Sequence, residues 1–214
     1  MSSATDLTLE VVPSGSGIAL DLGGNTGALR SPLGERGYRY INLDVRAFGA
    51  GEPSLIGDAH RLPFKDASLD VVVSKDTLEH FIEPWTVVQE VDRVLKRGGR
   101  FIIWVPFMHP FHGDDFYRYS PAGLRRMLKD FELIAFESPL WIFTVVGLAL
   151  VEALKRAHLG FAETPIKTFC GALDRFFTRR QKRPASFASA YRIVACKPDR
   201  VARGADRFRI VEAL

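Results

Sequence analysis

Cysteine is scarce in this sequence of 214 residues, which contains only Cys170 and Cys196. The two lie far apart, and neither belongs to a CxxC pair or to a cluster of Cys and His residues. This spacing excludes a disulfide framework and a cysteine-based zinc site. We therefore expect two unremarkable thiols.

The sequence also lacks the hydrophobic segments that export and membrane insertion require. Residues 1–17 show no basic region followed by an apolar core, so we expect no secretory signal and a cytoplasmic protein. The run 140–151 has only Thr144 as a polar residue. As a helix it would be about 18 Å long, whereas a membrane span needs roughly 30 Å. The run therefore predicts a buried cap or an interfacial helix.

Acidic residues are few in the C-terminal third. Residues 151–214 hold 14 Lys and Arg against 6 Asp and Glu, whereas residues 1–150 hold 15 against 19. This asymmetry predicts an anionic partner for the C-terminal third, such as phosphate, nucleic acid or a lipid surface. A basic face that only meets solvent is the alternative.

Seven short runs rich in β-branched and aromatic residues predict strands. They cover residues 17–22, 38–44, 54–58, 69–74, 100–106, 131–137 and 191–196. Helical spacing marks residues 83–96, with Pro84 in the first turn and Gly98 and Gly99 beyond the end. It also marks residues 120–129, where Ser120 is the expected N-cap and Pro121 the first helical residue.

This alternation predicts an α/β fold built on a doubly wound, Rossmann-like, mostly parallel sheet. We expect its last strand to be antiparallel and to follow a helical insertion over residues 139–189. We expect residues 1–214 to form a single domain. In such sheets, ligands bind at the carboxyl ends of the strands, near the point where the strand order reverses.

A glycine-rich loop follows the first predicted strand. Its residues are Asp21, Leu22, Gly23, Gly24, Asn25, Thr26 and Gly27. Glycines allow a sharp turn and a close approach of the backbone to a ligand. The dinucleotide pattern GxGxxG is absent, which disfavours an NAD-dependent enzyme. The acid that precedes the glycines suits a cationic amino-acid cofactor better than a phosphate.

Further acids end the next two predicted strands. Asp44, followed by Val45, lies 17 residues after Gly27, where a carboxylate can accept both hydroxyl groups of a ribose. Asp58 and Ala59 follow the third strand, where a side chain and a backbone N–H can bind the edge of an adenine.

These blocks resemble the class I methyltransferase superfamily, and most closely the bacterial group called methyltransferase type 11. The matching segments are residues 20–27, 42–45, 57–64, 67–74, 78–80 and 90–99, and the strand that ends at Pro106. The resemblance covers roughly residues 17–137. It implies S-adenosylmethionine as the cofactor.

The resemblance also implies a role for each matching residue. Asp21, Gly23, Gly24, Asn25 and Gly27 would surround the methionine moiety, Asp44 and Val45 the ribose, and Asp58 and Ala59 the adenine. Ser74 and its neighbours would lie beside the sulfonium. Asn25 departs from the family, which has glycine there. Because Asn tolerates positive φ better than most residues, we expect the loop to keep its shape.

Methyl transfer needs an aligned acceptor and often a base. The candidate bases are His80, His112 and Asp115, although His80 would also suit a structural position against the next helix. The polar and aromatic segment 109–121 resembles the HDYWRYTP-like signature of the same group and predicts a substrate mouth. His109, Tyr117 and Arg118 are the candidate substrate contacts. Alternatively, Arg118 pairs with Asp114 or Asp115 to brace the loop. We expect no metal.

The insertion combines the apolar run with the basic residues Arg175, Arg179, Arg180, Lys182 and Arg183. A peripheral membrane contact through residues 140–183, a substrate cap and a homodimer surface are left open. The basic run lacks interleaved aromatic residues, which disfavours nucleic acid. The expected function is methyl transfer to a small-molecule, sugar-linked or lipid-linked acceptor. The alternative is an inactive methyltransferase-fold protein that serves as a binding or scaffold module.

Overall fold

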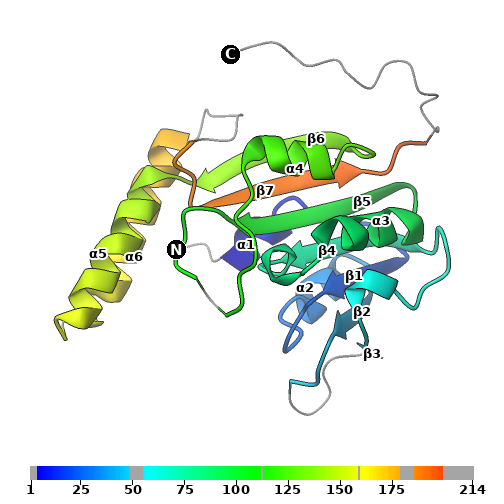
Figure 1. The fold of residues 1–214 in the computed structure, drawn as a ribbon, viewed down its shortest axis with the longest axis horizontal. Coiled ribbons are helices and arrows are strands. Elements are labelled where there is room, and N and C mark those ends of the chain that lie inside the picture. Colours follow the sequence, from blue (N-terminus) through cyan, green and yellow to red (C-terminus); the bar gives the residue numbers. More distant parts are fainter. Residues whose placement is uncertain (1–3, 49–54, 112, 159, 179–185, 200–214) are drawn as a thin grey trace, which may run out of the picture.

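Seven strands form one twisted sheet in the order β3-β2-β1-β4-β5-β7-β6 (Figure 1). The computed structural model describes residues 4–48, 55–111, 113–158, 160–178 and 186–199. The strands are β1 (Ile18–Leu22), β2 (Arg39–Asp44), β3 (Leu55–Ile56), β4 (Leu69–Lys75), β5 (Leu95–Pro106), β6 (Glu132–Leu140) and β7 (Ala190–Cys196). Neighbours from β3 to β5 pair in parallel, and β7 is antiparallel to β5 and β6. The predicted sheet, with its antiparallel last strand, is confirmed.

Helices lie on both faces of the sheet and in the insertion before β7. The α-helices are α1 (Ala4–Leu9), α2 (Arg30–Glu35), α3 (Pro84–Val94), α4 (Pro121–Met127), α5 (Ile142–Arg156) and α6 (Glu163–Thr178). The 3-10 turns are η1 (Ala59–Arg61), η2 (Leu78–His80) and η3 (Gly160–Ala162). The expected N-cap of α4 is present, because the Ser120 hydroxyl accepts from the Gly123 N–H at 3.1 Å.

The central strands are apolar because they are buried on both faces. On β4, Val72 packs in the core cluster that includes Val87 and Val91 of α3. Its neighbours Val71 and Val73 point to the opposite face, into a cluster completed by α1 and α2. Alternating side chains of one strand thus contact two different helix layers, which explains the continuous hydrophobic run in the sequence.

The start of β5 differs from the prediction. The strand begins at Leu95, immediately after α3 ends, rather than at residue 100. Leu95 pairs with Leu69, and the register then shifts before Val71 pairs with Arg100. Gly98, at φ 73°, donates its N–H to the Lys197 carbonyl within this irregular stretch. The glycines that were expected to end the helix therefore form a bend inside the strand.

The strand order reverses at β1, which lies between β2 and β4. Leu22 is in register with Leu43 on one side and with Ser74 on the other. The carboxyl ends of three strands therefore meet at one level. This is the place where open α/β sheets bind their ligands.

The insertion forms a helical hairpin of α5 and α6 that projects from the sheet beside the end of β6 (Figure 1). The two helices approach closely, because a Cβ added at Gly147 would lie 2.7 Å from the Cys170 Sγ. Among the described residues, no helix is long and apolar enough to cross a membrane. Arg179, Arg180, Lys182 and Arg183 lie outside the described residues.

Asp174 of α6 caps α5 from the side. Its fully buried carboxylate accepts hydrogen bonds from the backbone N–H groups of Trp141 (2.8 Å), Phe143 (3.1 Å) and Thr144 (2.9 Å). These N–H groups belong to the first turn of α5, where no carbonyl of the same helix can accept from them. One carboxylate therefore fixes the start of one helix to the end of the other.

Asp174→Ala is expected to destabilise the hairpin by about 1–3 kcal/mol, because it leaves buried donors without an acceptor. Amide hydrogen exchange of α5 under native conditions measures the loss, with the amides of α3 as the internal reference. Asp174→Asn, which keeps one acceptor oxygen, should lose less than Asp174→Ala. Unchanged exchange in α5 for both variants would contradict this role of Asp174.

Candidate functional site

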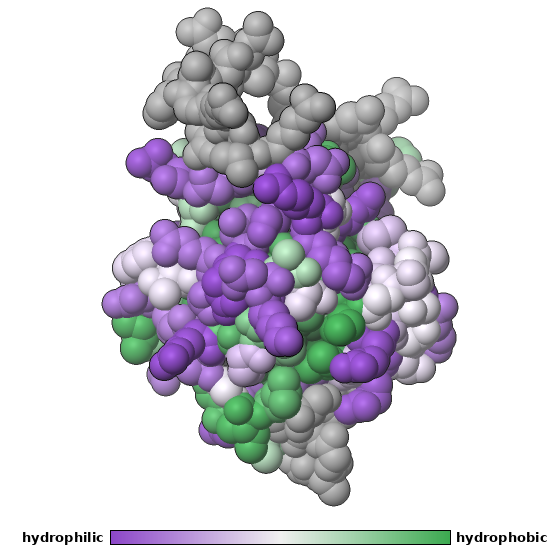
Figure 2. Space-filling model, turned by 90° about the vertical axis from the view of Figure 1, so that its right-hand side faces the viewer, coloured by the Kyte–Doolittle hydropathy of each residue, from purple (hydrophilic) through white to green (hydrophobic). Residues whose placement is uncertain are grey.

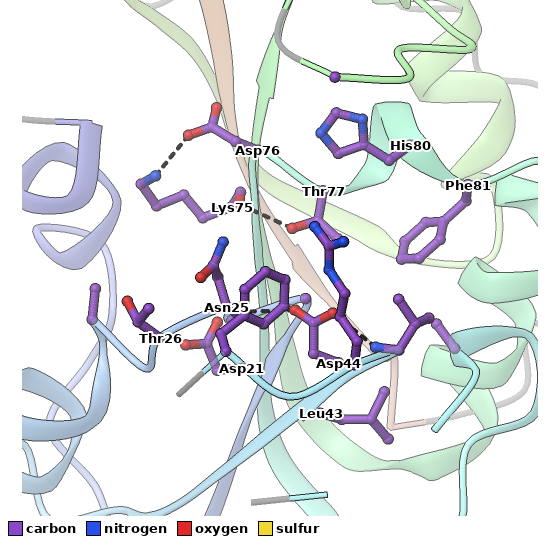
Figure 3. A pocket seen from close by; sticks show the side chains of 18 of the residues that line it. Asp21, Asn25, Thr26, Leu43, Asp44, Lys75, Asp76, Thr77, His80 and Phe81 are labelled. Atoms are coloured by element: carbon purple, nitrogen blue, oxygen red, sulfur yellow. Dashed lines mark hydrogen bonds and ion pairs between the residues drawn. The ribbon is translucent and has the colours of Figure 1, made fainter. Parts of the chain in front are cut away.

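A cavity of about 750 Å³ lies at the carboxyl ends of β1, β2 and β4 (Figure 3). Its walls come from the glycine loop after β1, the loop after β2, the segment from Lys75 to Thr77 that ends β4, and part of the loop before α4. This is the position that the reversal of strand order predicts. Its size is within the range of sites for small molecules and cofactors.

The glycine loop has no room for side chains at its first two glycines. A Cβ at Gly23, which has φ 70°, would lie 2.2 Å from the Thr77 Cγ2. A Cβ at Gly24 would lie 2.4 Å from an oxygen of the Asp21 carboxylate. Asn25 has φ 49°, so the residue that replaces the family glycine occupies the left-handed region. The loop keeps the shape expected for it.

Asp44 connects the glycine loop to β2. One carboxylate oxygen accepts from the Asn25 N–H at 3.0 Å, and the other accepts from the Val45 N–H at 2.7 Å. The side chain is mostly buried yet lines the cavity. Two backbone donors therefore hold this carboxylate in one orientation.

Asp21 lies on the other side of the glycine loop, and it is only 2% exposed. Its carboxylate accepts from the Tyr40 hydroxyl at 2.8 Å, and the Arg30 guanidinium lies 5.1 Å from the centre of the Tyr40 ring. Asp21 and Asp44 both line the cavity (Figure 3). The structure thus brings together the first two of the predicted acids.

Asp58 and Ser74 do not line the cavity. The Asp58 side chain is 67% exposed and binds the N–H and the ring of His60, and it does not line the cavity, although Gly57 and Ala59 do. This contact also lowers the pKa of Asp58, chiefly through the backbone N–H of His60. Ser74 is fully buried within the sheet and does not line the cavity either. Gly27, at φ 80°, belongs to the turn of the glycine loop but does not line the cavity.

Lys75, Asp76 and Thr77 occupy the place that was predicted for Ser74. They line the cavity, and the Lys75 ammonium pairs with the Asp76 carboxylate at 2.6 Å (Figure 3). The sequence prediction placed Ser74 and its neighbours here, but it named neither Asp76 nor Thr77. The pattern that selected Asp21 and Asp44, an acid at the end of a strand, would have found Asp76 as well.

His80 connects the cavity to the loop before α4. Its Nδ1 lies 3.1 Å from a carboxylate oxygen of Asp115 and 3.2 Å from the Asp114 carbonyl, and the histidine lines the cavity. The Arg118 guanidinium pairs with the other oxygen of Asp115, whose side chain is only 1% exposed. The structure therefore favours the alternative in which Arg118 braces the loop through Asp115.

Glu79 is fully buried directly behind His80. Burial raises its pKa to about 8; a backbone hydrogen bond and Arg118 oppose this shift, and the charges of Asp76 and Asp115 add to it. Among the described residues, Glu79, His80 and Asp115 bring ligand atoms within 4.8 Å of one another. Because the Arg118 cation already occupies this cluster, its charge is balanced without a metal.

The other predicted substrate contacts do not line the cavity. His109 is exposed, and its Nδ1 lies 3.0 Å from the Pro110 carbonyl. The Tyr117 hydroxyl donates to the Ile82 carbonyl at 2.9 Å, and its ring stacks on Tyr119. From this loop, Gly113, Asp114 and Phe116 reach the cavity instead. His112 lies outside the described residues.

The residues present suit S-adenosylmethionine. The glycine loop forms a cradle that a Cβ would fill, and the carboxylates of Asp21 and Asp44 can accept from an ammonium and from ribose hydroxyls. Val45, Phe48 and Phe81 give the same cavity an apolar side, where a purine ring can pack.

Residues 20–103 match the family described as Methyltransferase domain. An uncharacterized methyltransferase of Mycobacterium sp. (strain KMS) is 31% identical over 115 residues, which are 50% of this chain and 45% of the relative. The chain thus spans about half the length of the curated relatives it matches.

Solved structures share the fold at low identity. A putative methyltransferase of Haloferax volcanii, in complex with the Trm112 activator, is 22% identical at a TM-score of 0.62, with 91% of this chain and 89% of that chain covered. A phosphoethanolamine N-methyltransferase of Haemonchus contortus, in complex with phosphomonomethylethanolamine and S-adenosylhomocysteine, is 18% identical at a TM-score of 0.59. The match covers 91% of this chain and 52% of that chain. Residues 20–103 are therefore similar in sequence to methyltransferase domains, and the chain shares the fold of solved methyltransferases.

Proposed function

We propose that the chain transfers a methyl group from S-adenosylmethionine to a small-molecule, sugar-linked or lipid-linked acceptor. The observation that carries the proposal is the pair of buried carboxylates, Asp21 and Asp44, on either side of a glycine loop in one cavity. The cofactor would supply a methyl carbon activated by a sulfonium. The chain would bind it, exclude water and align the acceptor.

Asp44 would hold the ribose, because its carboxylate is already oriented by the N–H groups of Asn25 and Val45. Each oxygen keeps a further lone pair for a ribose hydroxyl. Ala59, Val45 and Phe81 would contact the adenine, and Asp21 with the glycine loop would contact the amino-acid end. Asp58 is not part of this proposal, since its side chain is committed to His60.

The acceptor would enter beside His80, Asp114 and Phe116, which line the loop side of the cavity. Asp115 and the Asp114 carbonyl both face the Nδ1 of His80, which favours the tautomer with a proton on Nδ1. The Nε2 of that tautomer is the basic nitrogen. We assign His80 as the group that accepts a proton from the acceptor, and Asp115 as its positioning residue.

Calorimetric titration tests the cofactor assignment. The chain is expected to bind S-adenosylmethionine and S-adenosylhomocysteine but not NAD. Asp44→Ala should weaken binding about tenfold to a hundredfold, because charge-assisted hydrogen bonds to the ribose are lost. Glu152→Ala removes a carboxylate from the exposed side of α5 and serves as the control. Failure of the folded wild type to bind either sulfur compound would overturn the proposal, and binding without turnover of any acceptor would favour the scaffold alternative.

Substitutions of Asn25 test the loop. Asn25→Gly should bind S-adenosylmethionine at least as well as the wild type, since glycine adopts φ 49° without strain. Asn25→Val should bind more weakly and melt at a lower temperature, because a branched side chain in the left-handed region costs about 1–2 kcal/mol. Titration and thermal melting give the two readouts. Equal binding by both variants would show that the loop conformation is unimportant.

Glu79 predicts a dependence of stability on pH. Its pKa in the folded state, about 8, is above the ordinary value of 4.5. The stability contributed by this group is therefore present below the ordinary pKa and is lost as pH rises through 8. Urea unfolding should show Glu79→Gln gaining on the wild type as pH rises, with a slope of up to about 1.4 kcal/mol per pH unit.

Glu132→Gln, at an exposed position on β6, removes one carboxylate in the same way and is the matched control. A difference for Glu79→Gln that is constant with pH would mean that Glu79 ionises normally in the folded protein.

A further inference from the structure

The α5–α6 hairpin exposes an unusual amount of apolar surface. Six of the sixteen large hydrophobic side chains that are exposed in the described part of the chain belong to it and its tip. They are Val146, Leu150, Phe161, Phe169, Phe176 and Phe177. On the face opposite the hairpin, hydrophilic and hydrophobic residues are intermixed (Figure 2). A concentration of this kind marks a contact surface.

The exposed side chains follow the helical repeat. Val146 and Leu150 are one turn apart on α5, with exposed fractions of 58% and 48%. Phe169 and Phe176 are two turns apart on α6, with 65% and 71%. Residues spaced by four or seven lie on the same face of a helix. Each helix therefore has one apolar face turned to solvent.

The inner faces of the two helices are already used. Gly147 lies against Cys170, and Asp174 caps the start of α5. The exposed apolar side chains of α5 and α6 therefore are not needed to hold the two helices together. Phe161, which is 83% exposed, stands in the turn between the helices.

Cations accompany this apolar surface. Lys155, Arg156, Lys167 and Arg175 are on the two helices, where Glu163 pairs with both lysines. The sequence then continues from α6 into Arg179, Arg180, Lys182 and Arg183. Residues 142–183, the two helices and the sequence that directly follows them, hold eight basic residues against three acidic ones. An apolar helix face with an excess of nearby cations fits an anionic lipid surface, whereas a second copy of the chain would bring like charges together.

The hairpin begins on the same edge of the sheet as the cavity. Leu140, where β6 ends, is in register with Ala190, and Ala190 is in register with Pro106 at the carboxyl end of β5. The cavity opens at the carboxyl ends of the neighbouring parallel strands. The hairpin and the cavity therefore lie at the same end of the strands.

We propose that the outward apolar faces of α5 and α6 bind the surface of an anionic lipid bilayer. The helices lie in the interface and do not span it, since among the described helices none is long and apolar enough to cross. Phe161, Phe169 and Phe176 enter the boundary between headgroups and acyl chains. This proposal does not depend on methyl transfer.

Sedimentation of the full chain with vesicles tests whether the apolar faces of α5 and α6 bind an anionic bilayer. The chain should pellet with vesicles of phosphatidylcholine and phosphatidylglycerol, but far less with phosphatidylcholine alone. Added salt should weaken binding, because it screens the attraction between the cations and the headgroups. The double variant Phe169→Ser/Phe176→Ser should lose about tenfold or more in partitioning, since two large apolar side chains are no longer buried in lipid.

Ile134→Ser is the matched control, because Ile134 is 55% exposed on β6 outside the hairpin. It should partition like the wild type. Circular dichroism shows whether each variant stays folded. Binding of S-adenosylhomocysteine is measured separately, so that a loss of vesicle binding can be distinguished from a loss of the cofactor site. No pelleting of the wild type at low salt would overturn the proposal. So would a dimer in light scattering that the double variant dissociates while vesicle binding stays unchanged.

Discussion

The site depends on one hydrogen bond between two neighbouring strand ends. The N–H of Asn25, in the loop after β1, donates to the carboxylate of Asp44 at the end of β2. This bond is possible only because Leu22 and Leu43 are in register, so that both strands end at the same level. It fixes the turn of the glycine loop and, at the same time, the orientation of the carboxylate toward the cavity. Structure and proposed ribose binding therefore share one side chain, and changes at Asp44 affect both.

Much of the fold could be predicted from the sequence, because buried parallel strands leave a strong pattern. The run around Val71, Val72 and Val73 is apolar at every position since both faces of β4 are covered. The start of β5 could not be predicted, because the bend at Gly98 depends on a bond to Lys197, about a hundred residues away. A glycine pair after a helix has the same sequence pattern whether it ends the helix or bends a strand.

The candidate site could be predicted only in part, and the reason is local competition for side chains. The Asp44 carboxylate accepts hydrogen bonds from backbone N–H groups and lines the cavity. The Asp58 carboxylate instead binds the N–H and the ring of His60, two residues later, and lies outside the cavity. The two acids look alike in the sequence. In the same way, the sequence left Arg118 as either a substrate contact or a partner of Asp114 or Asp115, and only the structure shows the pair with the buried Asp115. Strand ends are visible in a sequence, but the partner that each side chain selects is not.

The hairpin shows why the insertion is built as it is. An excursion between two antiparallel strands needs only a tight turn to connect Leu140 and Ala190, which are paired neighbours in the sheet. The chain instead forms two helices, fastened to each other by the Asp174 cap and the contact of Gly147 with Cys170. Internal fastening lets the hairpin keep its form while its apolar faces remain outside the core. Exposure of Phe169 and Phe176 to water is unfavourable in free energy, and burial of these side chains in a bilayer would remove that unfavourable contribution. The hairpin that carries them starts at the end of the strands where the cavity lies.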